Sequence, residues 1–221
     1  MTIVERLNRI KDSLPANVHL VAVSKFHSND AIMEAYNAGQ RVFGESRVQE
    51  VTKKYEDLPK DINWHFIGHL QTNKVKYIAP FITMVHSADS IKLIEELNLC
   101  AYKNNRTIDI LIQIHIAEED TKSGFSYSEA ESLFKENILS KYPFIKVKGL
   151  MGMATYTDND EQVKKEFAGL SAFFNKIKDT YYRENPDFIE LSMGMSDDYL
   201  MAVEKGSTMV RIGSKIFGER I

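Results

Sequence analysis

Short apolar runs alternate with longer amphipathic stretches along the whole 221-residue chain. Eight apolar, β-branched runs predict strands near residues 18–24, 41–44, 63–67, 82–86, 108–116, 145–151, 188–191 and 209–212. Between them, helical patterning predicts helices near residues 28–38, 46–57, 70–79, 90–104, 128–139, 160–182 and 197–204, with a short turn after Gly213. This alternation is typical of βαβ units built around a parallel sheet.

Eight such strands favour a closed single-domain (β/α)8 TIM barrel of α/β class over residues 1–221, preceded by an extra N-terminal helix at residues 2–13. Ser128 and Glu131 have capping-box spacing at the start of one helix. No Gly/Ser or Pro-rich linker interrupts the series. The alternative is an open doubly wound sheet, but that fold usually carries a Gly-rich phosphate loop after its first strand, where this chain has Ser24-Lys25-Phe26.

Lys25 follows the first predicted strand directly, at the end of a barrel strand where functional residues collect. Desolvation at an apolar barrel mouth would lower the pKa of its amine and supply the neutral nucleophile that imine chemistry needs. The alternative is a structural lysine that reaches from the strand end into solvent.

Two Ser/Gly turns follow the seventh and eighth strands, where TIM barrels often bind phosphate. The first is residues 192–196, with Ser196 expected at the N-terminus of the helix 197–204, and the second is Gly213-Ser214. Exposed backbone N–H groups and hydroxyls at such turns favour an anion, although Asp197 and Asp198 oppose one. The alternative is ordinary turn and cap chemistry.

Strand alternation places Arg211 opposite Val210 and Ile212, and thus toward the barrel mouth. Its partner there would be either a ring nitrogen that accepts a hydrogen bond or a nearby carboxylate. His65 and His69 do not share a helical turn, and neither H-E-x-x-H nor C-x-x-C occurs, so no metal site is expected.

The bulk composition excludes several classes of protein. A net charge of −3 offers no basic footprint for nucleic acid, and no apolar run approaches the length of a membrane span. The N-terminus has no signal-peptide pattern, and the single cysteine, Cys100, cannot form an internal disulfide. We therefore expect a soluble, cytoplasmic protein.

At these residues the chain resembles the pyridoxal phosphate homeostasis protein family. The matching motifs follow in order along nearly the whole chain: AVSK at 22–25, FGES at 43–46, HFIGHLQTNK at 65–74, KSGF at 122–125, GLMGM at 149–153, LSMGMSDD at 191–198, GSTMVRIGS at 206–214 and FG at 217–218. The chain departs from the family at Ser46, where the family usually has Asn, at Arg47, where it has an aromatic residue, and after Lys25, where its common proline is absent.

The resemblance implies a barrel like the N-terminal domain of alanine racemase, with pyridoxal 5′-phosphate (PLP) held as a covalent imine on Lys25. It implies that Ser196, Gly213 and Ser214 hold the phosphate and that Arg211 faces the pyridine nitrogen. The expected cofactor-binding residues are, in full, Lys25, Ser46, Ser192, Met195, Ser196, Arg211, Gly213 and Ser214.

Three functions remain open at this point: a PLP-binding carrier or regulatory protein, a PLP-dependent amino-acid racemase, and a cofactor-free Schiff-base enzyme such as an aldolase. The carrier is favoured because arginine at the pyridine nitrogen makes a poor electron sink, and because no second β-rich domain follows the eighth strand. An aldolase would leave Arg211 without a role. Tyr156 and His69 are candidates for the second base of a racemase. The expected partners are PLP and acceptor PLP-dependent apo-enzymes, with the protein a monomer or weak dimer.

Overall fold

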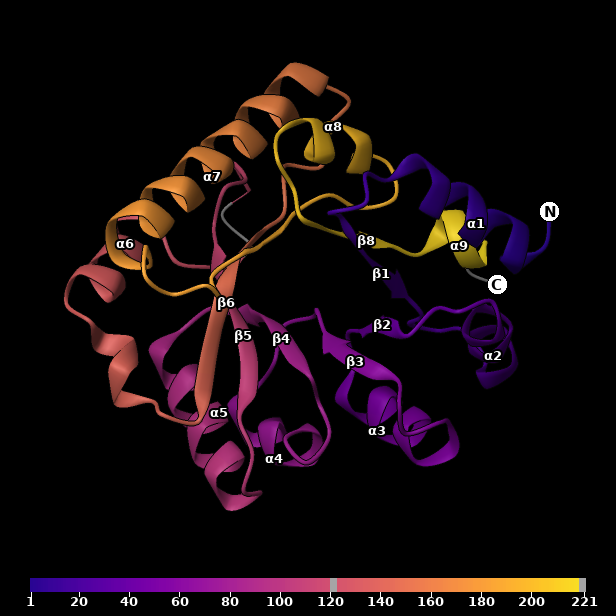
Figure 1. Ribbon diagram of the computed structural model, residues 1–221, viewed down its shortest axis with the longest axis horizontal. Helices are drawn as coiled ribbons and strands as arrows, with labels where there is room; N and C mark the ends of the chain where they lie inside the picture. Colours follow the sequence, from indigo (N-terminus) through magenta and orange to yellow (C-terminus); the bar gives the residue numbers. More distant parts are fainter. Residues whose placement is uncertain (120–122, 219–221) are drawn as a thin grey trace.

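The computed structural model describes residues 1–119 and 123–218. Eight parallel strands follow one another around a closed barrel, and β8 pairs with β1 to complete it (Figure 1). The strands are β1 His19–Val23, β2 Val42–Glu45, β3 Asn63–Phe66, β4 Met84–Ala88, β5 Ile108–Ile114, β6 Ile145–Gly152, β7 Glu190–Ser192 and β8 Met209–Ile212. The predicted (β/α)8 barrel is confirmed, and the open sheet was the wrong alternative.

Helices surround this barrel on the outside, as Figure 1 shows. They are α1 Ile3–Ser13, α2 Asn29–Asn37, α3 Val48–Asp57, α4 Val75–Ile78, α5 Ile91–Lys103, α6 Tyr127–Lys135, α7 Asp160–Tyr181, α8 Tyr199–Glu204 and α9 Ser214–Phe217, with short 3-10 helices at Thr72–Lys74 and Ile138–Lys141. The extra helix α1 packs Leu7 and Ile10 into the core and lies beside α9, where Arg6 Nε donates a 2.6 Å hydrogen bond to the Ile216 carbonyl.

The apolar core lies mainly between the strands and the helices. Alternation along the strands sends one set of side chains outward into this layer and the other into the barrel. On β8, Val210 and Ile212 join the large outer core, while Met209 joins a small interior cluster that includes Met84 and Leu111. The predicted separation of Arg211 from Val210 and Ile212 is therefore found.

The helix predicted near residues 70–79 is shorter, with a 3-10 turn at Thr72–Lys74 followed by α4 at Val75–Ile78, and most other starts differ by one or two residues. Two of these starts have a clear physical cause. The capping box of α6 is Ser126 with Glu129, because the chain stays extended as far as Phe125, which bridges to Ile114 on β5. The spacing S-x-x-E occurs twice in succession here, and only this tertiary pairing selects the first. Helix α8 begins at Tyr199, not at residue 197, so Ser196 lies before the helix and does not cap it.

No helix among residues 1–119 and 123–218 has both the length and the apolar character that crossing a membrane would require.

Candidate functional site

A cavity of about 440 Å³ opens where the carboxyl ends of the barrel strands meet, a size in the range of ligand pockets. It brings together seven of the predicted site residues from four different strand ends. Its lining consists of Val23, Lys25, His27, Ser46, Ile67, Gly68, His69, Gln113, Ser123, Met153, Met195, Ser196, Arg211, Gly213, Ser214 and Gly218.

The charged side chains of this lining favour an anionic ligand. Lys25 and Arg211 are the basic side chains of the lining, and no aspartate or glutamate is among the described lining residues. A concave site lined by one sign of charge concentrates ligands of the opposite sign. Hydroxyls from Ser46, Ser196 and Ser214 add neutral hydrogen-bonding groups to the same cavity.

Arg211 is almost fully buried in the barrel interior. Its Nη1 donates to Ser192 Oγ at 2.6 Å, and its Nη2 donates to the Gly152 carbonyl at 3.1 Å. Burial lowers the pKa of Arg211 to about 10, an effect that the more distant Asp198 carboxylate opposes, so the side chain still carries its charge at neutral pH. The described contacts of this cation are therefore neutral, and the predicted alternative of a direct carboxylate partner is not among them.

Ser192 is fully buried and does not line the cavity. Its hydroxyl accepts from Arg211 and lies 3.0 Å from His86 Nδ1, and His86 Nε2 lies 2.9 Å from His65 Nδ1. Direct contact of Ser192 with a ligand, as expected from the sequence, conflicts with this position, because the side chain is fully buried and lies outside the described lining. Ser192 supports Arg211 instead.

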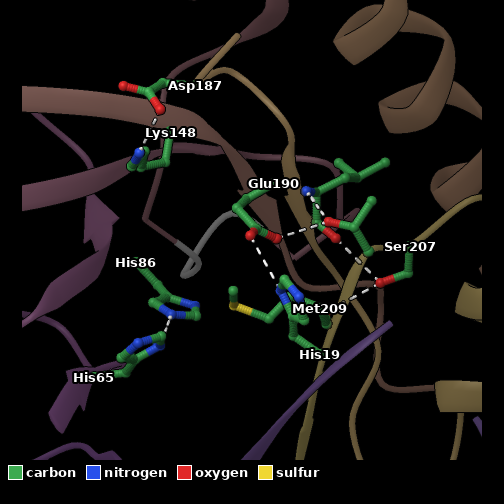
Figure 2. A network of polar contacts seen from close by, with 10 residues as sticks. His19, His65, His86, Lys148, Asp187, Glu190, Ser207 and Met209 are labelled. Atoms are coloured by element: carbon green, nitrogen blue, oxygen red, sulfur yellow. Dashed lines mark hydrogen bonds and ion pairs between the residues drawn. The ribbon is translucent and has the colours of Figure 1, made fainter. Parts of the chain in front are cut away.

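The pair His65 and His86 lies inside the barrel with the two rings turned toward each other (Figure 2). Burial lowers the pKa of His65 to about 3, and burial also places the pKa of His86 well below its ordinary value. Both rings are therefore neutral near pH 7. Arg211 donates to the Ser192 hydroxyl, this hydroxyl shares a second hydrogen bond with His86 Nδ1, and His86 Nε2 shares one with His65 Nδ1. A continuous chain of hydrogen bonds thus links Arg211 to His65.

The two Ser/Gly turns meet at the cavity. Ser196 Oγ accepts a 3.3 Å hydrogen bond from Gly213 N, which joins the turn after β7 to the turn after β8. A side chain at Gly213 would approach the Val23 carbonyl oxygen to 3.0 Å, so glycine lets this turn lie against the end of β1. Asp198 accepts from Met195 N at 2.5 Å, so this backbone donor is occupied within the protein.

Lys25 is half-buried in the turn that follows β1. The next residue, Phe26, has a φ of 69°, a left-handed conformation that is uncommon for a bulky side chain. Ser46 lies beyond the end of β2, and the close approach of Gly68 to its backbone holds it there, because a Cβ at Gly68 would lie 2.6 Å from Ser46 O.

His69 lines the rim of the cavity, and its Nδ1 lies 3.0 Å from Asp89 Oδ2. Tyr156, the other candidate for a second base, is 95% exposed and is not part of the described lining. No group of three or more metal-ligating side chains occurs within the described ranges. Lys122, part of one motif, lies outside the described residues.

Sequence reasoning missed several side chains near the site. Gln113 and Ser123 line the cavity, and the Gln113 side-chain amide donates to the Ser123 carbonyl at 2.7 Å. His86 carries no motif of its own, although its place on β4 among alternating apolar residues could have indicated an inward side chain. Glu45 and Lys54 form a buried pair beside the Lys25 turn.

The barrel with its cavity at the strand ends is the fold of the alanine racemase N-terminal domain. The family model of the alanine racemase N-terminal domain matches residues 2–221. An alanine racemase of Clostridium difficile 630 has the same fold, with a TM-score of 0.79 at 15% identity, over 99% of this chain and 56% of that one.

Relatives with higher sequence identity then identify the family. Proteins named pyridoxal phosphate homeostasis protein are 43% identical in Aquifex aeolicus, over 91% of this chain and 86% of the relative, and 39% identical in Schizosaccharomyces pombe, over 92% and 85%. The structure of PipY from Synechococcus elongatus with PLP bound has a TM-score of 0.87 at 35% identity, over 98% of this chain and 100% of PipY. The chain belongs to the pyridoxal phosphate homeostasis protein family.

Proposed function

We propose that this protein binds PLP covalently through Lys25 and serves the intracellular homeostasis of PLP as a carrier or regulatory protein. The observation that carries the proposal is the convergence of Lys25, the buried Arg211 and the joined Ser196 and Gly213 turns on one cavity. The names of the relatives and the PLP-bound PipY structure support it.

Each part of the ligand has a counterpart among the lining residues. Ser196, Gly213 and Ser214 would hold the phosphate, and Arg211 would face the ring nitrogen as a hydrogen-bond donor. Ser46 and Met195 would contact the ligand from the rim. Lys25 Nζ would attack the aldehyde carbon, so that the C–N double bond replaces the C=O bond and one water molecule leaves. Bound PLP supplies a conjugated ring able to delocalise electrons from a carbon attached to the imine nitrogen.

The absence of strong turnover is part of the proposal. A guanidinium at the ring nitrogen keeps that nitrogen unprotonated, and an unprotonated ring is a weaker electron sink than one paired with a carboxylate. The carrier therefore uses the imine for retention of PLP and not for carbanion chemistry. A cytoplasmic location, a monomeric or weakly dimeric state and transfer of PLP to PLP-dependent apo-enzymes complete the proposal.

The test of the site is reduction with borohydride after addition of PLP, followed by peptide mapping. The adduct is expected on Lys25 and is expected to vanish in Lys25→Ala, while Lys74→Ala serves as the control and retains it. An adduct on Lys74 or Lys122 of the unaltered protein would overturn the assignment.

An amino-acid racemase is the second candidate, and the His69–Asp89 pair at the cavity rim favours it. A carboxylate that orients an imidazole is the usual arrangement of a general base. The discriminating assay incubates the PLP-loaded protein with L- and D-amino acids in deuterium oxide and follows α-proton exchange and optical inversion. Turnover of about 1 s⁻¹ or faster would establish an enzyme, and loss of that turnover in His69→Ala would identify the base.

A further inference from the structure

The turn that carries Lys25 is tied on both sides to an ionic cluster, buried at Glu45 and Lys54 and partly exposed at Glu50, that the proposed function does not use. The cluster consists of Glu45 at the end of β2 and of Glu50 and Lys54 on α3. Lys54 Nζ lies 2.8 Å from Glu45 Oε1 and 2.6 Å from Glu50 Oε1. All three side chains come from β2 and from the helix α3 that follows it. Strand β2 lies next to β1, whose end presents Lys25.

On the N-terminal side of Lys25, the cluster holds Ser24 twice. The Lys54 ammonium donates to the Ser24 carbonyl oxygen at 2.8 Å, and the Ser24 hydroxyl donates to Glu45 Oε1 at 2.6 Å. Ser24 is fully buried, so neither bond competes with bulk water. The backbone immediately before Lys25 therefore has little freedom.

On the C-terminal side of Lys25, the backbone N–H of Phe26 donates to Glu50 Oε1 at 2.6 Å. This bond fixes the peptide between Lys25 and Phe26 at the residue whose φ is 69°. A left-handed conformation at a bulky residue costs free energy and persists only where surrounding contacts impose it. Glu50 supplies such a contact, and Lys54 in turn holds the Glu50 carboxylate.

A contribution to folding stability does not by itself explain why these three charged side chains lie together. Buried ion pairs often contribute no more to folding than apolar residues of similar size, because desolvation offsets the attraction. Here Glu45 Oε2 is buried without a hydrogen-bond partner among the described residues, which adds to that cost. The described hydrogen bonds of the three side chains go to Ser24, to Phe26 or to one another. This pattern indicates that the cluster sets the geometry of the turn.

We propose that Glu45, Glu50 and Lys54 are positioning residues that hold the turn Ser24–Phe26 so that Lys25 Nζ points into the cavity in the orientation needed to attack an aldehyde. The inference rests on the proposed function, since it assigns to these three side chains the alignment of the Lys25 amine. The bonds formed and broken are those of imine formation alone: the amine nitrogen joins the aldehyde carbon, and the aldehyde oxygen leaves as water.

The test compares two ligands that differ only in whether they can react with an amine. PLP forms the imine, whereas pyridoxine 5′-phosphate has an alcohol in place of the aldehyde and reports the non-covalent site alone. Glu50→Ala removes the acceptor for Phe26 N, Glu50→Gln retains it, and Lys54→Met removes the ammonium. Glu56→Ala and Lys53→Met are the matched controls, because both residues are exposed on the same helix.

In Glu50→Ala, imine formation with PLP is expected to slow by about tenfold or more, as small misalignments of reacting groups do, while the Kd of pyridoxine 5′-phosphate changes less than about twofold. Glu50→Gln should recover most of the rate, and the two controls should match the unaltered protein. Hydrogen exchange at the Phe26 amide should accelerate in Glu50→Ala but not in Glu56→Ala, a readout independent of any ligand.

Two results would overturn the inference. One is an unchanged rate of imine formation in Glu50→Ala, and the other is an equal loss of pyridoxine 5′-phosphate binding, which would mean a general disruption of the site. If Lys54→Met does not fold, the comparison of Glu50→Ala with Glu50→Gln still tests the inference. Failure of the unaltered protein to form an adduct on Lys25 would refute the proposed function itself and is thus distinct from either result.

Discussion

Arg211 Nη1 lies 2.6 Å from Ser192 Oγ, so a charged side chain that faces the cavity is held by a neutral hydroxyl on the neighbouring strand. The same hydroxyl lies 3.0 Å from His86 Nδ1, which makes Ser192 the link between the arginine and the interior histidines. The hydroxyl accepts from the guanidinium and shares a second hydrogen bond with the imidazole, so one oxygen joins the two groups. The orientation of Arg211 therefore depends on groups that lie outside the described cavity lining.

Replacing Ser192 with alanine should remove this link. Arg211 Nη1 and His86 Nδ1 would lose their shared partner in a buried site, which should lower the free energy of unfolding by about 1–3 kcal/mol. Urea titration of the ligand-free protein measures the change, with the exposed Ser132→Ala as control. Equal stabilities of Ser192→Ala and the control would contradict the supporting role of Ser192.

The two joined turns predict a phosphate site to which both the turn containing Ser196 and the turn containing Ser214 contribute. Ser196→Ala and Ser214→Ala should each weaken PLP binding by about 0.5–1.5 kcal/mol, the usual net contribution of one hydrogen bond. Because Ser196 Oγ also accepts from Gly213 N, its loss should additionally loosen the second turn, and the double variant need not be additive. Fluorescence or absorbance titration with PLP gives the affinities. If the double variant bound PLP as tightly as the unaltered protein, the phosphate would lie elsewhere.

The buried His65 predicts a dependence of stability on pH. Its pKa is about 3 in the folded protein, lowered mainly by burial, against 6.5 as the ordinary value. The unfolded chain therefore binds one more proton than the folded chain between these two pH values. Stability is lost as the pH falls through this window, by about 1.4 kcal/mol per pH unit well below 6.5.

His65→Gln removes this contribution, while the carboxyl groups titrate alike in both proteins and burial still lowers the pKa of His86. The free energy of unfolding, measured in urea from pH 7 to pH 4, should fall less steeply in the variant. The difference between the two slopes should approach one proton. Parallel curves would mean that the pKa of His65 is the same in the folded protein and in the unfolded chain.

Gly149 predicts a strong effect on the fold. Its φ is 154°, and a Cβ there would lie 1.7 Å from Glu190 O on the paired strand β7. Gly149→Ala should force β6 and β7 apart and destabilise the protein by about 4 kcal/mol or more. Gly169→Ala, inside α7, is the matched control, because alanine favours a helix over glycine by about 0.5–1 kcal/mol and only the Tyr127 hydroxyl lies near. Similar melting temperatures for the two variants would refute this reading of the β6–β7 contact.

The sequence by itself determined the barrel and the basic and serine-rich part of the cavity lining. Eight apolar runs separated by amphipathic stretches specify parallel strands with helices outside, and the carboxyl ends of such strands meet at one rim wherever the helices fall. Lys25, Arg211 and the turns containing Ser196 and Gly213 could therefore be brought together from their positions alone. Alternation along β8 sufficed to turn Arg211 inward.

Only the tertiary structure decided which groups support these residues. The depth of Ser192 depends on how β7 pairs with β6 and β8, and the start of α8 at Tyr199 depends on the Asp198 contact with Met195. The chain from His65 to Arg211 joins four strands, and the bonds of Lys54 to Ser24 and Glu45 join a helix to two strand ends. Such contacts link residues 9 to 106 positions apart in the sequence. Hydrophobic periodicity does not predict them, because it tells which face of a strand a polar side chain occupies but not which distant side chain it will contact.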